Sequence, residues 1–211
     1  MRIRTNRPTF ILLTVSALVG CGKSSHKNAE STPPPSDDRK VFSLAGIANT
    51  SFKSDCTLED GSTDRADNET LTFAENSFEN IWMNFDGADC DPAKKRTTYI
   101  KKLTNVEKEV TPDIAGWTSY VFTYESITAT PHTVILTRLF NSGKVYGYTD
   151  WVINQPKEIT GRKYQESSEA KQAKGAVRTN TTKIDGDTLL LARYVADKAS
   201  TDKPFVYKRV K

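Results

Sequence analysis

From residue 49 onward the chain alternates apolar and polar residues at a period of two, and this pattern restricts the fold more than any other feature. The alternating segments are rich in Thr, Val, Tyr and Phe, and most of them stop at a turn signal. This pattern is typical of β-strands with one buried face. We expect ten strands: Asn49 to Leu58, Glu69 to Glu75, Ser77 to Asp86, Thr97 to Val110, Trp117 to Thr128, Thr133 to Phe140, Lys144 to Ile153, Val177 to Asp185, Thr188 to Val195 and Phe205 to Val210.

Short turn signals separate these segments at 74–77, 86–87, 141–143 and 185–187. Because a tight turn can join only antiparallel strands, the sequence predicts an all-β, antiparallel meander. Closing about eight to ten strands into a barrel would remove the exposed sheet edges, and a sandwich is the alternative. The segment 166–174 is the one helical candidate, ended by Gly175.

The N-terminus has the proportions of a secretory signal peptide. Three arginines at positions 2, 4 and 7 precede an apolar run from Phe10 to Val19. This run of about ten residues is too short to span a bilayer, which needs roughly 20 apolar residues. We therefore assign residues 1–20 to a signal peptide that is removed from the mature protein.

The four residues Leu18-Val19-Gly20-Cys21 close this apolar run. They resemble the lipobox of bacterial lipoproteins, whose cysteine is lipidated and becomes the mature N-terminus. The resemblance implies a diacylglyceryl thioether on Cys21 and a further acyl chain, such as palmitate, on its amine. Gly22 stands where Asp would signal inner-membrane retention, so an outer-membrane anchor in the cell envelope is expected, facing the periplasm or the cell surface. The alternative is an ordinary secreted protein in which Cys21 only neighbours the cleavage site.

Residues 21–40 are polar and rich in Ser and Pro, which predicts a disordered tether, and residues 41–211 are long enough to form one folded domain. Removing residues 1–20 takes away three arginines and no acidic residue, so the formal charge falls from +4 to +1. A nearly neutral chain argues against a nucleic-acid partner. The basic clusters at 94–96 and 101–102 are interpreted as a solvated strand edge.

Two cysteines, Cys56 and Cys90, remain inside the predicted domain. Export to an oxidising compartment favours a disulfide between them. The alternative, free thiols or half of a metal site, lacks a nearby third ligand.

Three short motifs resemble the lipocalin-like (calycin-type) barrels found in bacterial lipoproteins. They are the segment 50–56 with its cysteine, the segment 69–73, and the closing segments 185–189 and 207–209. Phe52 stands where such proteins have Trp, and the resemblance implies that Arg209 or Arg193 packs over it by cation–π contact. It further implies a lipocalin-like barrel that holds a small ligand.

Catalytic and metal-binding motifs are scarce. The chain has no G-x-S-x-G, H-E-x-x-H or phosphate-binding glycine motif, so His132 is interpreted as a loop residue and no enzyme activity is expected. The acidic runs at 59–67 and 86–91 offer oxygen ligands for calcium, but Asp and Gly are also ordinary turn formers. We expect no metal and no cofactor.

Aromatic residues on the predicted strands either line a ligand cavity or fill the core. The candidate ligand-binding residues are Trp82, Trp117, Tyr120, Phe122 and Tyr124. The sequence thus predicts a lipid-anchored lipoprotein that binds a small apolar ligand. The alternative is a structural lipoprotein of the envelope with a filled core, whose partner is another envelope protein.

Overall fold

The computed structural model of the chain describes residues 47–59, 61–108, 114–165, 171–195 and 198–211. All of them belong to the second of the two units into which the chain divides, Lys40–Lys211. The predicted signal peptide, the predicted tether and Cys21 lie outside the described residues.

The described part of the chain forms one antiparallel sheet of ten strands, with one α-helix and two short 3-10 turns. The strands are β1 (Thr50–Ser54), β2 (Thr57–Leu58), β3 (Arg65–Phe73), β4 (Phe78–Asp86), β5 (Lys95–Lys108), β6 (Thr118–Pro131), β7 (Lys157–Glu158), β8 (Val177–Asp185), β9 (Thr188–Val195) and β10 (Lys198–Arg209). The helices are η1 (Pro92–Lys94), α1 (Val134–Ser142) and η2 (Val145–Gly147). None of these helices is long and apolar enough to cross a membrane.

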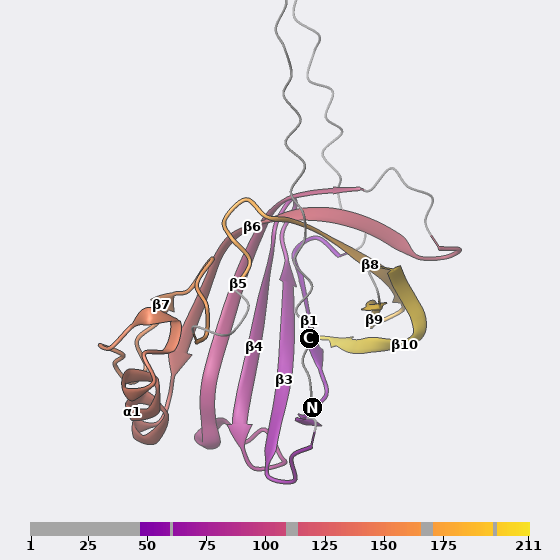
Figure 1. Cartoon of the computed structure of the whole chain (residues 1–211). Helices are drawn as coiled ribbons and strands as arrows, with labels where there is room; N and C mark the ends of the chain where they lie inside the picture. Colours follow the sequence, from indigo (N-terminus) through magenta and orange to yellow (C-terminus); the bar gives the residue numbers. More distant parts are fainter. Residues whose placement is uncertain (1–46, 60, 109–113, 166–170, 196–197) are drawn as a thin grey trace, which may run out of the picture. The chain divides into compact units, whose positions relative to one another are not determined.

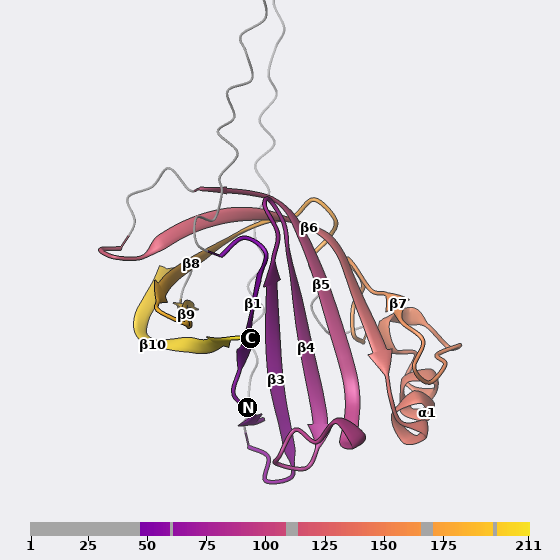
Figure 2. The ribbon, with the colours of Figure 1, turned by 180° about the vertical axis from the view of Figure 1, so that it is seen from behind.

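Strands that follow one another in the sequence pair in the sheet, as a meander requires. The pairing runs from β3 through β4, β5, β6, β8 and β9 to β10. β1 then pairs with β10 on one side and with β3 on the other. Figures 1 and 2 show β3, β4 and β5 side by side, β6 curving across their ends toward β8, and α1 with β7 beside the opposite end of β6.

The apolar core lies on one face of these strands. Phe73 and Phe78 pair across β3 and β4, and Phe78 faces Leu103 on β5. The Phe73 and Phe78 rings stack at 5.4 Å, and Phe78 meets Phe122 edge-to-face at 5.2 Å. Successive side chains of a strand point to opposite faces, so the period-two pattern of the sequence supplies this core directly.

The predicted contact over Phe52 is confirmed for one of the two candidate arginines. Phe52 is fully buried in β1, and the Arg209 guanidinium lies 5.1 Å from the centre of its ring. Phe52 pairs with Arg209 across β1 and β10, so the register of these strands brings the two together. Arg193 instead lies over Phe205, at 4.4 Å.

The predicted disulfide is present. Cys56 follows β1, Cys90 follows β4, and their sulfur atoms are bonded. The bond ties the start of β2 to the turn after β4. This turn also meets the loop before β3, because the Gly87 N–H donates to the Asp64 carbonyl at 2.6 Å.

The strand predicted over Thr133 to Phe140 is wrong, since these residues belong to helix α1. Thr133 caps the helix, with its Oγ1 accepting from the Leu136 N–H at 3.1 Å. The buried side chains are Leu136 and Phe140, four residues apart, and this is helical spacing. Burial of that pair outweighs the strand preference of the β-branched residues.

The strand predicted over Lys144 to Ile153 is also wrong. Lys144, Tyr146 and Gly147 have φ angles of 48°, 55° and 76°. These left-handed conformations form the 3-10 turn η2 and are incompatible with an extended strand.

The other predicted strands are present, and their bounds differ from the predicted ones only in detail. Residues 166–170 of the predicted short helix lie outside the described residues, and residues 171–174 are not helical. The first predicted strand, Asn49 to Leu58, is divided into β1 and β2. The last one begins earlier than expected, at Lys198, and contains a register shift between Ser200 and Phe205.

Candidate functional site

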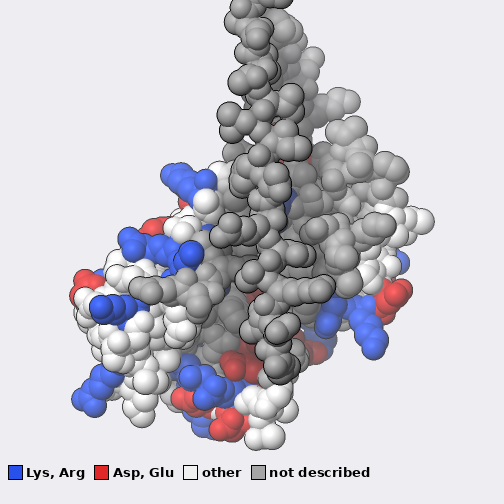
Figure 3. All heavy atoms as spheres, viewed as in Figure 1, with Lys and Arg blue, Asp and Glu red and all other residues white. Residues whose placement is uncertain are grey.

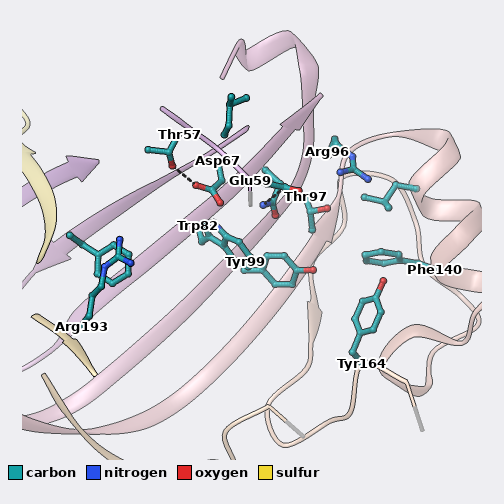
Figure 4. Close-up of a pocket in the computed structure, with 14 residues that line it drawn as sticks. Thr57, Glu59, Asp67, Trp82, Arg96, Thr97, Tyr99, Phe140, Tyr164 and Arg193 are labelled. Atoms are coloured by element: carbon teal, nitrogen blue, oxygen red, sulfur yellow. Dashed lines mark hydrogen bonds between the residues drawn. The ribbon is translucent and has the colours of Figure 1, made fainter. Parts of the chain in front are cut away.

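A hollow of about 710 Å³ opens on the same face of the sheet as the core, at the other end of β3, β4 and β5 (Figure 4). A second hollow, of about 550 Å³, shares five lining residues with it. The first is lined by Thr57, Leu58, Glu59, Asp67, Trp82, Asn84, Arg96, Thr97, Tyr99, Leu136, Phe140, Tyr164, Arg193 and Phe205. The residues of this face change along the strands from Phe and Leu to Asp, Asn and Thr, so the core gives way to a polar hollow.

Two stacked aromatic rings lie in the middle of the hollow. Trp82 on β4 pairs with Tyr99 on β5, and their rings stack at 5.3 Å with an interplanar angle of 26°. Both side chains are half-buried. Large rings that retain an accessible part can stack against a flat or apolar ligand.

Carboxylates line the β2 and β3 side of the hollow. Asp67 Oδ1 accepts a hydrogen bond from Thr57 Oγ1 at 3.0 Å. Glu59 Oε1 accepts from Asn84 Nδ2 at 3.1 Å. No salt bridge among the described residues involves either carboxylate.

Glu69 is the third carboxylate on this side, and neutral donors hold it in place. It accepts hydrogen bonds from Asn80 Nδ2 and from the Tyr207 hydroxyl. Its own N–H donates to Ser54 Oγ at 2.8 Å. These bonds join β3 to β1, β4 and β10 at the floor of the second hollow.

Cationic side chains reach the hollows from β5 and β9. Lys101 and Arg193 line the second hollow, and neither forms a salt bridge with another described residue. Lys171 lies 5.6 Å from the centre of the Tyr99 ring. Burial lowers the pKa of Lys171, and the nearby charge of Lys101 lowers it further. Lys101 therefore faces the hollow, whereas the sequence predicted a solvated strand edge at 101–102.

Helix α1 and the segment after it form the remaining wall. Phe140 meets the Trp151 ring edge-to-face at 5.2 Å and Tyr164 at 6.5 Å. Trp151 is anchored by its Nε1–H, which donates to the Val145 carbonyl at 3.1 Å. This aromatic cluster holds the buried side of α1 against the hollow, as Figure 4 shows for Phe140 and Tyr164.

Two tyrosines on the inner face, the buried Tyr207 and the half-buried Tyr99, are neutral phenols. Burial raises the pKa of Tyr99 above its ordinary value near 10. Burial also raises the pKa of Tyr207, and the neighbouring Glu69 carboxylate adds to the effect. Both phenols keep their protons when an unfolded tyrosine loses its own.

We therefore expect the free energy of unfolding to fall as the pH rises above 10. Above that pH the unfolded state binds fewer protons than the folded state, so Tyr207 lowers stability by up to about 1.4 kcal/mol per pH unit. Tyr99 acts in the same direction. Urea unfolding between pH 9 and pH 11, in the wild type and in Tyr207→Phe, measures this slope. Tyr207→Phe should start from a lower stability but show a shallower slope, and an unchanged slope would contradict the assignment.

The five predicted ligand-binding residues do not lie together at one site. Trp82 lines both hollows. Tyr120, Phe122 and Tyr124 are buried in the packed core, with exposed fractions of 0, 3 and 8%. Trp117 is half-buried just before β6 and lines neither of these two hollows.

Sequence reasoning missed most of the polar lining. Lys101 and Arg193 occupy inward positions of predicted strands. Asp67 was assigned to an acidic run of turn formers before the predicted strand, but it lies within β3, which begins at Arg65. The available signal was the alternation itself, since Asp67 and Glu69 share the face of Leu71 and Phe73.

His132 has a structural role at the start of α1. Its Nε2 lies 2.8 Å from Thr98 Oγ1, and its Nδ1 lies 2.7 Å from Asn154 Oδ1. Both ring nitrogens are thereby engaged in hydrogen bonds within the fold. Across the described ranges, no group of three or more His, Cys, Asp or Glu side chains is arranged to hold a metal ion.

Comparison with known proteins finds no protein-family model and no curated protein that matches this chain.

Proposed function

We propose that the chain is a lipid-anchored lipoprotein of the bacterial cell envelope whose folded unit is a lipocalin-like barrel that binds a small ligand. The pairing of β1 with both β3 and β10 supports closure of the sheet. The Arg209 contact over Phe52 supports the lipocalin resemblance. The lipobox-like residues that end at Cys21 support the anchor.

The hollow around Trp82 is the observation that carries the binding function. Its volume of about 710 Å³ falls within the range of small-molecule sites, and aromatic walls surround a few fixed polar groups. Leu136, Phe140 and the Trp82–Tyr99 stack suit the apolar part of a ligand. Asp67 and Arg193 suit polar groups at one end of the ligand. The ligand that fits best is therefore apolar with a polar head.

Binding of the uncharged aromatic probe 1-N-phenylnaphthylamine, followed by its fluorescence, tests this function. Wild-type protein should bind the probe saturably, and Trp82→Ala should weaken binding about tenfold because a stacking surface is lost. Trp117→Ala is the matched control, since it removes a tryptophan that lines neither hollow, and it should bind normally. The thermal midpoint of each variant shows whether it is folded. Absence of saturable binding by the wild type, or equal loss in both variants, would contradict a site at Trp82.

An envelope protein that acts through its outer surface is the second candidate. The tightly packed core around Phe78, Tyr120 and Phe122 favours it, because much of the inner face is filled by side chains. Wild-type protein that leaves the probe unbound would favour this alternative.

A further inference from the structure

Helix α1 exposes aliphatic side chains on the side that faces away from the hollow. Val134, Ile135 and Leu139 have exposed fractions of 53, 73 and 58%. Leu136 and Phe140, on the opposite side of the helix, are only 8 and 3% exposed. The helix is therefore apolar on two sides, and only one of them packs against the fold.

The loop after η2 extends this apolar surface. The backbone of Trp151 exchanges two hydrogen bonds with the Asn141 side chain, in the last turn of α1. Asn154 bonds to His132, which lies just before the helix. The loop thus runs beside α1 from one end to the other.

Between these two attachments, Val152 and Ile153 are 43 and 39% exposed. We call the surface formed by these two and the three helix residues the aliphatic patch. Its five residues are Val134, Ile135, Leu139, Val152 and Ile153. Clustered aliphatic side chains with this exposure indicate an interaction surface, whereas scattered ones would need no explanation.

Basic residues lie next to the aliphatic patch, on α1 itself and beyond its C-terminal end. Arg138 lies on the same exposed arc of α1, between Val134 and Leu139. Lys144, Arg162 and Lys163 line one hollow of about 490 Å³ beyond the C-terminal end of the helix. In the segment 132–164, five Lys or Arg residues stand against two Asp or Glu residues.

Among the described residues, Lys157 is the one basic residue of this segment that forms a salt bridge. Asp150 pairs with Lys157 at 2.8 Å, and Glu158 accepts hydrogen bonds from within the fold. Figure 3 shows blue side chains next to white surface in the part of the view where Figure 1 draws α1 and β7. The surface is therefore apolar at its centre and positively charged at its rim.

We propose that the aliphatic patch and its basic rim dock on the surface of an anionic lipid bilayer. Aliphatic side chains on a helix can enter the boundary between headgroups and acyl chains, while Lys and Arg face the lipid phosphates. The charge of the rim is complementary to such a surface. This docking is separate from the anchor at Cys21, and it would bring the α1 wall of the hollow next to the membrane.

Co-sedimentation of a shortened chain that begins at Gly22, and so lacks the lipidation site, with lipid vesicles tests the proposal. Vesicles of phosphatidylcholine mixed with phosphatidylglycerol should bind the protein, and vesicles of phosphatidylcholine alone should bind it much less. Binding should weaken as salt is added, because salt screens the rim. Replacing Arg138 and Lys144 together by Gln should weaken binding about fivefold for each charge removed.

The double variant Ile135→Ser/Leu139→Ser should lower partitioning onto the anionic vesicles at least about tenfold. Val177→Ser is the matched control, because Val177 is 63% exposed on β8, outside the patch, and it should bind as wild type does. Equal binding of the double variant and the wild type would overturn the proposal. Wild-type protein that does not bind anionic vesicles would also overturn the proposal. The same holds if the protein self-associates through the patch instead of binding them. Probe binding at Trp82 should persist in the double variant, which separates failure of this proposal from failure of the ligand site.

Discussion

Reduction of the Cys56–Cys90 disulfide is expected to lower the free energy of unfolding by up to about 4 kcal/mol. The bond closes a loop with a sequence separation of 34 residues, which contains the whole of β2, β3 and β4. Without it, the unfolded chain gains the conformational freedom of that loop. Because β2 has only two residues and follows Cys56 directly, the rim of the hollow at Thr57 and Leu58 should loosen as well.

Urea unfolding with and without dithiothreitol measures the effect. Cys56 is exposed and Cys90 is half-buried, so the reductant can reach the bond. The double variant Cys56→Ser/Cys90→Ser is the control, and its stability should be low and insensitive to reductant. A wild-type midpoint that does not move, in a protein whose two thiols react with a thiol reagent before reduction, would contradict the bond.

Much of the sheet was predictable because each strand carries its own alternating pattern. The bounds of β8 and β9 agree with the sequence analysis, since the turn at Asp185-Gly186-Asp187 separates two clear alternations. Gly186 has a φ of 58°, as a tight turn there requires. Local signals therefore sufficed for the hairpin of β8 and β9.

The segment 132–164 was not predictable in the same way. Val134 and Ile135 favour strands locally, but burial of Leu136 and Phe140 against the hollow decides in favour of a helix. The signals that could have indicated α1 are Thr133 as its N-cap and Gly143 after its last turn. Contacts with distant residues such as Trp151 and Tyr164 determine the rest.

The candidate site was only partly predictable. Trp82 was selected as an aromatic residue on a predicted strand, and so were Tyr120 and Phe122, which fill the core. Trp82 differs from Tyr120 and Phe122 in its position along the inner face, and this position depends on strand register. Register also brings Asp67 and Arg193 to one hollow from strands that are far apart in the sequence.

Replacing Cys21 by alanine is expected to prevent formation of the lipid-anchored mature protein. At about 0.8 kcal/mol per buried CH2 group, two or three acyl chains anchor a protein stably, so a mature form without these chains should not enter the detergent phase. The variant should also keep its signal peptide, because the lipoprotein peptidase that the resemblance implies cleaves next to a lipidated cysteine. Phase separation in Triton X-114 and mass spectrometry of the intact protein measure both effects, with Ser24→Ala as the control variant in the tether. A Cys21→Ala protein that is still recovered in mature form from the detergent phase would refute the anchor.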